Sequence, residues 1–397
     1  MSVVTNAALD GPGNPLRQLT LDQLRQRTSI KWRGYPDDVL PLWVAEMDVL
    51  VAEPVAKAVT DAIASGDTGY PAGNAYAEAV AAFAAERWGW NDLDPGRIRT
   101  VPDMMLGVVE MLKLVTRPGD AVIVNSPVYP PFHAFPVFNG RKVIEAPLGP
   151  DHRIDFAALA AAFELALGRG GRAAYLLCSP HNPTGTVHTR AELSRVARLA
   201  ADYGIPVVAD EAHSPLVAPD TAFTPYLTVP GTEHAYAVTS AAKAWNLPGL
   251  RGAVAIPGSG TDLSRMPEQM ASSISHLGAI AHATAFREGG RWLDGLLEDL
   301  AENRRILAAA LAEHVPGVRY RPQPGSYLAW LDCRALGLGD DPAVRFLEHG
   351  RVAVNSGLPF GTGGKGHVRL NYATTPEILT EAVARMAAAL DRTEAIA

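Results

Sequence analysis

Short apolar runs alternate with longer amphipathic segments through the middle of this 397-residue chain. The runs AVIVN, AAYLLCS, PVVAD and HAYAVTS predict strands at residues 121–125, 173–179, 206–210 and 234–240. Between them lie segments such as TRAELSRVARLAADYG, which has the periodicity of a helix. Strands that are apolar throughout are typical of a largely parallel sheet covered by helices on both faces. The sequence therefore predicts an α/β fold whose ligands bind beyond the carboxyl ends of the strands, where Asp210 and Ser240 lie.

The pattern changes after about residue 290. A long helical segment, RWLDGLLEDLAENRRILAAALAEH, is followed by the strand GSYLAWLDC, a glycine-rich loop, the strand HVRLNYA and a closing helix. We expect residues 290–397 to form a smaller α+β domain and residues 49–289 to form a large domain that contains the ligand-binding edge of the sheet. Residues 1–48 are irregular but contain the apolar stretch LPLWVAEMDV, so we expect them to contribute to the small domain.

Composition excludes several classes of function. The formal net charge is −7 and the sequence pI is near 5.9, so we expect no nucleic acid partner. Cys178 and Cys333 are too few for a disulfide framework or a thiolate cluster, which fits a reducing compartment, and we expect no metal. The N-terminal sequence is unlike a secretory leader, and no apolar run reaches about 18 residues. We therefore expect a cytoplasmic protein with no membrane partner.

The stretch SAAKAWNLPGLRG places Lys243 among small and apolar residues. A desolvated lysine has a lowered pKa and readily forms imines, although a lysine whose stem packs while its ammonium reaches water is the simpler alternative. Ser240 and Arg251 offer a hydroxyl and a guanidinium suited to a phosphate. The amides of Met104 and Met105 begin a helix and could add an anion site, unless that helix is simply capped.

A second group of polar and aromatic side chains follows the predicted strands. Asp210 could cap a turn, or it could hold a proton on the pyridine nitrogen of pyridoxal phosphate. His213 and Asn182 could bond the phenolic oxygen of that ring, or be a core histidine and part of an ordinary NPTG turn. Tyr129 could stack on the ring or pack in the core.

Together these residues resemble a known family. NPTG, ADEAH, SAAK with Arg251, and RLN with Arg369, in this order, resemble fold-type I pyridoxal-phosphate enzymes of the aspartate aminotransferase superfamily, class I/II. SIKWRGYPDDVLPLWVAEMDV, SPVYPPF, SPHNPTG, DEAHS, KAWNLPGLRGA and GHVRLNYAT look like the cystathionine β-lyase group of the MalY/PatB type. The resemblance covers nearly the whole chain. It implies a mostly parallel seven-stranded sheet sandwiched by helices, with a smaller α+β domain.

The resemblance also implies roles for individual residues. Lys243 would form the aldimine and act as a catalytic residue with Asp210 and Tyr129. The residues implied to bind the cofactor are Met104, Met105, Tyr129, Asn182, Asp210, His213, Ser240, Lys243, Arg251 and, from the neighbouring subunit of a homodimer, Tyr70. Arg369, helped by Asn182 and the backbone near Ala45, would bind the α-carboxylate of an amino-acid substrate.

The implied reaction is carbon–sulfur β-elimination from L-cystathionine or a related S-substituted cysteine, giving a thiol, pyruvate and ammonia. An aminotransferase, or a specialised biosynthetic enzyme acting on a modified amino acid, would use the same residues. A binding or regulatory protein without catalysis is a further alternative, which the intact residue set disfavours. The chain departs from the family pattern at Glu46 and Val49, at Pro215 and Ala242, and in the loop with Lys365 and His367.

Overall fold

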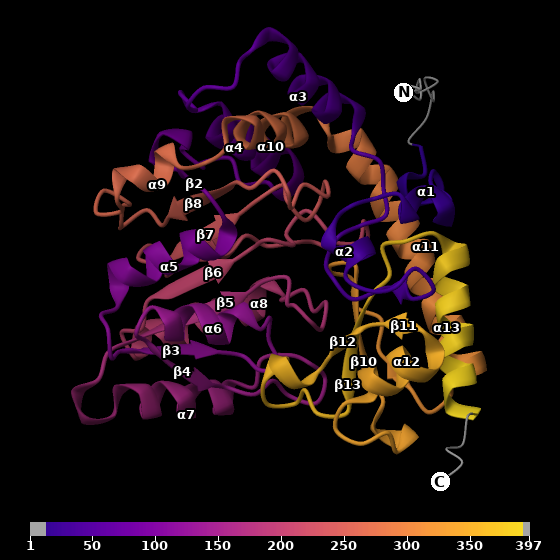
Figure 1. The fold of residues 1–397 in the computed structure, drawn as a ribbon. Helices are drawn as coiled ribbons and strands as arrows, with labels where there is room; N and C mark the ends of the chain where they lie inside the picture. The colour runs from indigo at the N-terminus through magenta and orange to yellow at the C-terminus, as the bar shows by residue number, and fades with distance from the viewer. Residues whose placement is uncertain (1–12, 392–397) are drawn as a thin grey trace.

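The computed structural model describes residues 13–391, and its largest sheet has seven strands in the order β2-β8-β7-β6-β5-β3-β4 (Figure 1). Their bounds are β2 Arg99–Val101, β3 Ala121–Val124, β4 Lys142–Glu145, β5 Ala173–Cys178, β6 Val207–Asp210, β7 Tyr236–Thr239 and β8 Ala253–Pro257. All but β8 point the same way, since β8 pairs antiparallel with both β2 and β7. The mostly parallel α/β sheet expected from the sequence is confirmed.

Alternate residues of each strand point to opposite faces of this sheet, and both faces carry apolar side chains. Helices therefore cover both faces. Val122, Val124 and Val208 pack with α5, whereas Ile123 and Ala209 belong to the core formed with α7 and α8. The helices are α1 Leu21–Arg25, α2 Ile30–Arg33, α3 Glu53–Ser65, α4 Ala75–Trp88, α5 Met104–Val115, α6 Pro131–Phe138, α7 Phe156–Leu167, α8 Arg190–Asp202, α9 Glu268–Ser272, α10 His276–Glu288, α11 Gly290–His314, α12 Pro342–Gly350 and α13 Pro376–Asp391.

The carboxyl ends of the central strands lie level with one another. Cys178, the last residue of β5, is paired with Asp210, the last residue of β6, and Asp210 is in turn paired with Val238 in β7. The loops after these three strands therefore start from one edge of the sheet, which is where open α/β sheets bind their ligands.

A second, four-stranded antiparallel sheet has the order β12-β13-β10-β9 and lies with α12 and α13 at one side of the large sheet (Figure 1). Its strands are β9 Arg319–Tyr320, β10 Leu328–Asp332, β12 Asn355–Ser356 and β13 His367–Asn371. Near the N-terminus, β1 (Leu40–Pro41) pairs in parallel with β11 (Val352–Ala353).

This pairing joins the N-terminal segment to the C-terminal part of the chain, and the amide of Leu16 also donates to the Asp299 carboxylate of α11 at 2.9 Å. The expected domain limits at residues 48/49 and 289/290 stay predictions, and residues 1–12 and 392–397 of the outer segments lie outside the described residues. Across residues 13–391, no helix combines the length and the apolar character needed to cross a membrane.

Candidate active site

A cavity of about 210 Å³ opens at the carboxyl edge of the large sheet. Ten of the twelve site residues expected from the sequence line it: Ala45, Met104, Met105, Tyr129, Asn182, Asp210, His213, Lys243, Arg251 and Arg369. These residues come from the N-terminal segment, from the start of α5, from the end of β6, from the loops after β3, β5, β6 and β7, and from β13. The chain therefore folds so that motifs spread over more than 300 residues meet in one place.

Lys243 lies in the turn that follows β7, and its Nζ donates a hydrogen bond to the carbonyl of Ala45 at 3.2 Å. Burial lowers the pKa of Lys243 to about 8, with a further contribution from the nearby positive charge of Arg369. An amine with this pKa is partly neutral near neutral pH. The side chain is therefore suited both to imine formation and to accepting a proton.

Asp210 ends β6 at the base of the cavity, where its Oδ1 accepts the amide N–H of Ala212 at 3.0 Å. Burial raises the pKa of Asp210 to about 6, against the opposing effect of the Ala212 hydrogen bond. A buried carboxylate gains most from a cationic partner, because such a partner offsets the loss of hydration. A protonated ring nitrogen in the cavity would be such a partner.

Asn182 connects two of the expected site residues. Its carbonyl accepts the amide of Tyr129 at 3.0 Å, and its side-chain Oδ1 accepts from Nη1 of Arg369 at 3.1 Å. His213 is held by a hydrogen bond between its Nδ1 and Ser326 Oγ at 3.1 Å, and burial lowers its pKa to about 3. A neutral imidazole therefore faces the cavity.

Arg369, in β13, is 5% exposed and is fixed by neighbours on several sides. Its Nη2 donates to Asn355 Oδ1 at 2.6 Å and to the carbonyl of Trp43 at 3.2 Å. Burial lowers its pKa to about 10, and its Nε is buried without a hydrogen-bond partner among residues 13–391. A buried guanidinium bonded only to neutral oxygens favours an anionic ligand.

The expected phosphate end of the cavity lies at the start of α5. Asp103 caps this helix, since its Oδ1 accepts the amide of Met105 at 2.9 Å. Arg251 points across from the loop after β7, with its side chain 70% exposed and its Nη1 3.7 Å from Asp103 Oδ2. A helix N-terminus beside a loosely paired arginine is a suitable environment for a phosphate.

Two expected cofactor residues lie elsewhere. Ser240 is fully buried and does not line the cavity, because its hydroxyl donates to the carbonyl of Gly252 at 2.6 Å and accepts the amide of Ala242 at 3.0 Å. Tyr70 is 90% exposed and also lies outside the cavity lining. Direct phosphate contact by Ser240 stays a prediction, and so does the contact of Tyr70 with a neighbouring subunit.

Sequence reasoning expected only the backbone near Ala45 to contribute to the site, and it missed the longer segment around that residue. In residues 43–48, which we call the strap, the backbone carbonyls of residues 43–47 accept hydrogen bonds from side chains of other elements. The acceptor–donor pairs are Trp43 with Arg369, Val44 with Asn371, Ala45 with Lys243 and Tyr327, Glu46 with Lys31 and Asn371, and Met47 with Arg27 and Asn246. Asn371 lies inside the RLN motif, so its importance could have been inferred, whereas Tyr327 and Asn246 carry no such signal.

Three of the residues that depart from the family pattern lie in different surroundings: the cavity, the surface and a buried position outside the cavity. Ala242 lines the cavity beside Lys243. Lys365 instead forms an exposed ion pair with Asp340 at 2.8 Å. His367 stacks on Trp330 with ring centroids 5.2 Å apart and does not line the cavity.

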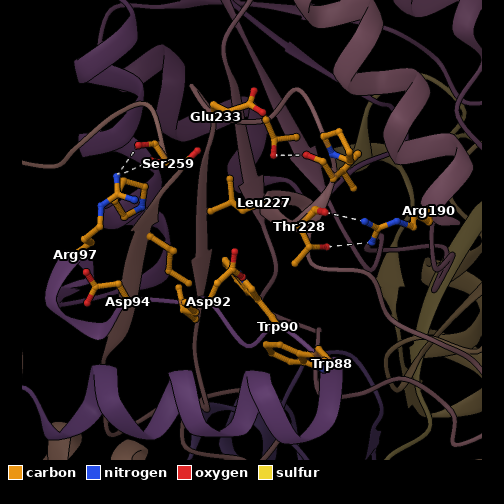
Figure 2. Close-up of a pocket in the computed structure, with 18 residues that line it drawn as sticks. Trp88, Trp90, Asp92, Asp94, Arg97, Arg190, Leu227, Thr228, Glu233 and Ser259 are labelled. Atoms are coloured by element: carbon orange, nitrogen blue, oxygen red, sulfur yellow. Dashed lines mark hydrogen bonds between the residues drawn. The ribbon is translucent and has the colours of Figure 1, made fainter.

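A larger cavity, of about 570 Å³, lies at the amino end of β7, away from the expected residues (Figure 2). Its arginines already bond backbone carbonyls: Arg97 donates to Gly258 and Thr261, and Arg190 donates to Thr228. None of the twelve expected site residues lines it. The smaller cavity, which gathers those residues, is therefore the candidate active site.

The residues of this cavity fit pyridoxal phosphate. Lys243 supplies an amine of lowered pKa, Asp210 a buried carboxylate, and Arg251 with the start of α5 an anion site. Within the described residues, no cluster of three or more His, Cys, Asp and Glu side chains is placed to hold a metal ion.

Comparisons with known proteins agree with this geometry. The profile of the family "Aminotransferase class I and II" matches residues 37–386. A Mycobacterium leprae protein named "Putative cystathionine beta-lyase" is 55% identical over 395 residues, covering 95% of this chain and 98% of the relative. The cystathionine beta-lyase of Corynebacterium glutamicum is 32% identical, covering 93% of this chain and 99% of the relative.

Among solved structures, cystalysin from Treponema denticola, which contains a pyridoxal 5'-phosphate cofactor, matches with a TM-score of 0.85 and 25% identity, covering 92% of this chain and 96% of that chain. The family profile and these relatives span nearly all of the chain, as the ordered motifs do. The chain therefore belongs to the aminotransferase class I and II family of enzymes that depend on pyridoxal phosphate.

Proposed function

We propose that this enzyme is a carbon–sulfur β-lyase that cleaves L-cystathionine or related S-substituted cysteines to a thiol, pyruvate and ammonia. The main support is that one cavity brings together an amine of lowered pKa, a buried carboxylate and a buried arginine. The 55% identity over 395 residues to a relative bearing a cystathionine β-lyase name supports this reaction over others of the family.

The cofactor would be held at both ends. Asp210 would pair with the ring nitrogen, Asn182 and His213 would flank the phenolic oxygen, and Tyr129 would cover the ring. Arg251 and the start of α5 would bind the phosphate. When bound, pyridoxal phosphate supplies an aldehyde that links to amines and a ring that accepts electrons from the substrate α-carbon.

Arg369 would bind the α-carboxylate of the amino acid. Its Nη1 and Nη2 are already oriented by Asn182, Asn355 and the carbonyl of Trp43, so little side-chain entropy remains to be lost on binding. A carboxylate held here would bring the α-carbon into the cavity that Lys243 also lines.

Lys243 would then act as the general base. Its neutral Nζ takes the α-proton, and the electron pair left on the α-carbon leads to cleavage of the bond between the β-carbon and sulfur. The sulfur leaves with that electron pair and takes a proton to become a thiol. The remaining three-carbon product reacts with water to give pyruvate and ammonia.

Further proposals concern assembly and location. The exposed Tyr70 would reach the phosphate of a neighbouring subunit, which makes the active unit a homodimer. Residues 1–48 and 290–397 would form the small domain, and residues 49–289 the large one. Both cysteines are free and buried, which supports a cytoplasmic location.

The test is to mix the pyridoxal-phosphate-loaded enzyme with L-cystathionine and, separately, with an S-alkyl cysteine, and to follow pyruvate and free thiol together. Release of both in equal amounts is the expected result. A change in the cofactor absorbance without thiol release would contradict the lyase assignment. An aminotransferase would then be identified by amino-group transfer to an added keto acid.

A further inference from the structure

His282 of α10 lies fully buried directly behind the loop that carries Arg251. Its Nε2 is 2.7 Å from the carbonyl of Leu250, the residue before Arg251. A carbonyl can only accept, so Nε2 carries the proton and Nδ1 is an acceptor. Nδ1 lies 3.0 Å from the hydroxyl of Tyr76 in α4 and 3.4 Å from Ser240 Oγ.

The directions of these hydrogen bonds follow from their partners. The Ser240 hydroxyl donates to the carbonyl of Gly252 at 2.6 Å, so its proton is engaged there. Tyr76 is therefore the donor to Nδ1 of His282, and its ring also meets the imidazole edge-on at 5.4 Å. Burial lowers the pKa of His282 to about 4, so the ring is neutral near neutral pH and keeps this arrangement.

The carbonyls on both sides of Arg251 are thus fixed, that of Leu250 by His282 and that of Gly252 by Ser240. The helix approaches this backbone closely, because a Cβ placed on Gly278 would lie 2.6 Å from the carbonyl oxygen of Arg251. The side chain of Arg251, by contrast, is 70% exposed, and within residues 13–391 its one ion pair is the 3.7 Å contact with Asp103. These backbone contacts therefore set where the Arg251 side chain starts and the direction in which it leaves the loop.

We propose that His282, held by Tyr76, is a positioning residue that sets the backbone at Arg251 and so aims its guanidinium at the phosphate of the cofactor. This inference rests on the proposed binding of that phosphate by Arg251. Neither His282 nor Tyr76 lines the candidate active site, so both act through the Leu250–Gly252 loop.

The test compares the binding of pyridoxal phosphate and of pyridoxal, which lacks the phosphate, to the apoenzyme, followed by absorbance. The ratio of the two dissociation constants reports the phosphate end of the site alone. His282→Leu should reduce the preference for pyridoxal phosphate by about tenfold or more and leave pyridoxal binding nearly unchanged. His282→Gln should restore most of it, since its amide Nε2 can still donate to Leu250.

Tyr76→Phe removes the donor to Nδ1 at nearly constant volume and should reduce the same ratio by a few-fold. If His282→Leu fails to fold, Tyr76→Phe alone tests the proposed positioning role. Tyr236→Phe is the matched control, because Tyr236 is also buried and its hydroxyl bonds Thr261 at 2.6 Å, but it begins β7 at the end away from the cavity.

An unchanged ratio in both His282→Leu and Tyr76→Phe would overturn the proposal, as would equal weakening of both ligands. Loss of thermal stability with an unchanged ratio would show that His282 is merely structural. A wild-type enzyme that binds the two ligands equally would refute the phosphate site itself. Failure of the lyase assay leaves this binding test unaffected, so the two assignments can be judged separately.

Discussion

At the scale of single residues, burial determines the chemistry of the candidate active site. Desolvation lowers the pKa of both Lys243 and Arg369 and raises that of Asp210. The two lowered pKa values leave the side chains in different charge states near neutral pH. Arg369, with a pKa of about 10, stays charged, whereas Lys243, with a pKa of about 8, is partly neutral. Arg369 can therefore bind an anion, whereas Lys243 can react as a neutral amine.

The pKa of Lys243 predicts how covalent capture of pyridoxal phosphate by the apoenzyme depends on pH. Only the neutral amine attacks the aldehyde, so the rate should rise as pH increases through about 8 and then level off. An ordinary lysine, with a pKa near 10.5, would give a rate that keeps rising tenfold per pH unit beyond about pH 9. Stopped-flow absorbance measures this rate, and Lys243→Ala should abolish it.

Because the buried guanidinium of Arg369 can make two parallel hydrogen bonds to a carboxylate, replacing Arg369 by lysine should weaken substrate binding. Arg369→Lys keeps the charge but cannot reproduce a bidentate contact, so KM for the amino acid should rise by roughly tenfold or more. Arg351→Lys is the matched control, since Arg351 makes a bidentate pair with Asp38 at 2.7 and 2.9 Å on the surface. Equal KM values for the two variants would remove Arg369 from carboxylate binding.

At the scale of elements, the strap depends on groups that lie beneath it. The Nζ of Lys31 is 2.8 Å from Asp48 Oδ2 and donates to the carbonyl of Glu46 at 3.0 Å, with both charged side chains almost fully buried. Asp48 also accepts from Nε1 of Trp32 at 2.9 Å. This buried pair holds the segment that supplies the Ala45 carbonyl to Lys243.

Lys31→Met should therefore destabilise the enzyme strongly. Removing the lysine leaves Asp48 buried without its cation, which typically costs about 3–5 kcal/mol. Lys57→Met is the control, because Lys57 forms an exposed pair with Asp61 within α3 and its loss should cost far less stability. Denaturant unfolding measures both, and equal losses for the two variants would contradict this account of the strap.

The element scale also shows what the sequence could predict. Asp210 and Lys243 follow strands whose apolar runs are visible in the sequence, so their place at the carboxyl edge of the sheet could be inferred. Beyond the backbone near Ala45, which the resemblance implied, the strap could not be predicted, because backbone carbonyl acceptors carry no side-chain signature. The bond from the Ser240 hydroxyl to the carbonyl of Gly252 could not be predicted either, because only the folded loop brings the two within reach, and its contact with a phosphate stays a prediction.

At the scale of the whole molecule, the proposed dimer requires that one chain complete the site of the other. Tyr70 lies between α3 and α4, 90% exposed and outside the lining of its own chain's cavity. A closed two-fold dimer makes any such contribution reciprocal. Each active site would then take Lys243 from one subunit and Tyr70 from the other.

This arrangement predicts complementation between two inactive or weakened enzymes. Tyr70→Phe and Lys243→Ala, unfolded together and refolded at equal concentrations, should form mixed dimers that contain one site with both native residues. Random pairing makes half of all dimers mixed, and each mixed dimer has one intact site out of two. Activity should therefore reach about a quarter of the wild-type value. Pyruvate release measures it, with each variant refolded alone as the control. Activity equal to the mean of the two variants would show that Tyr70 serves no neighbouring site, because sites built within a single chain gain nothing from mixing.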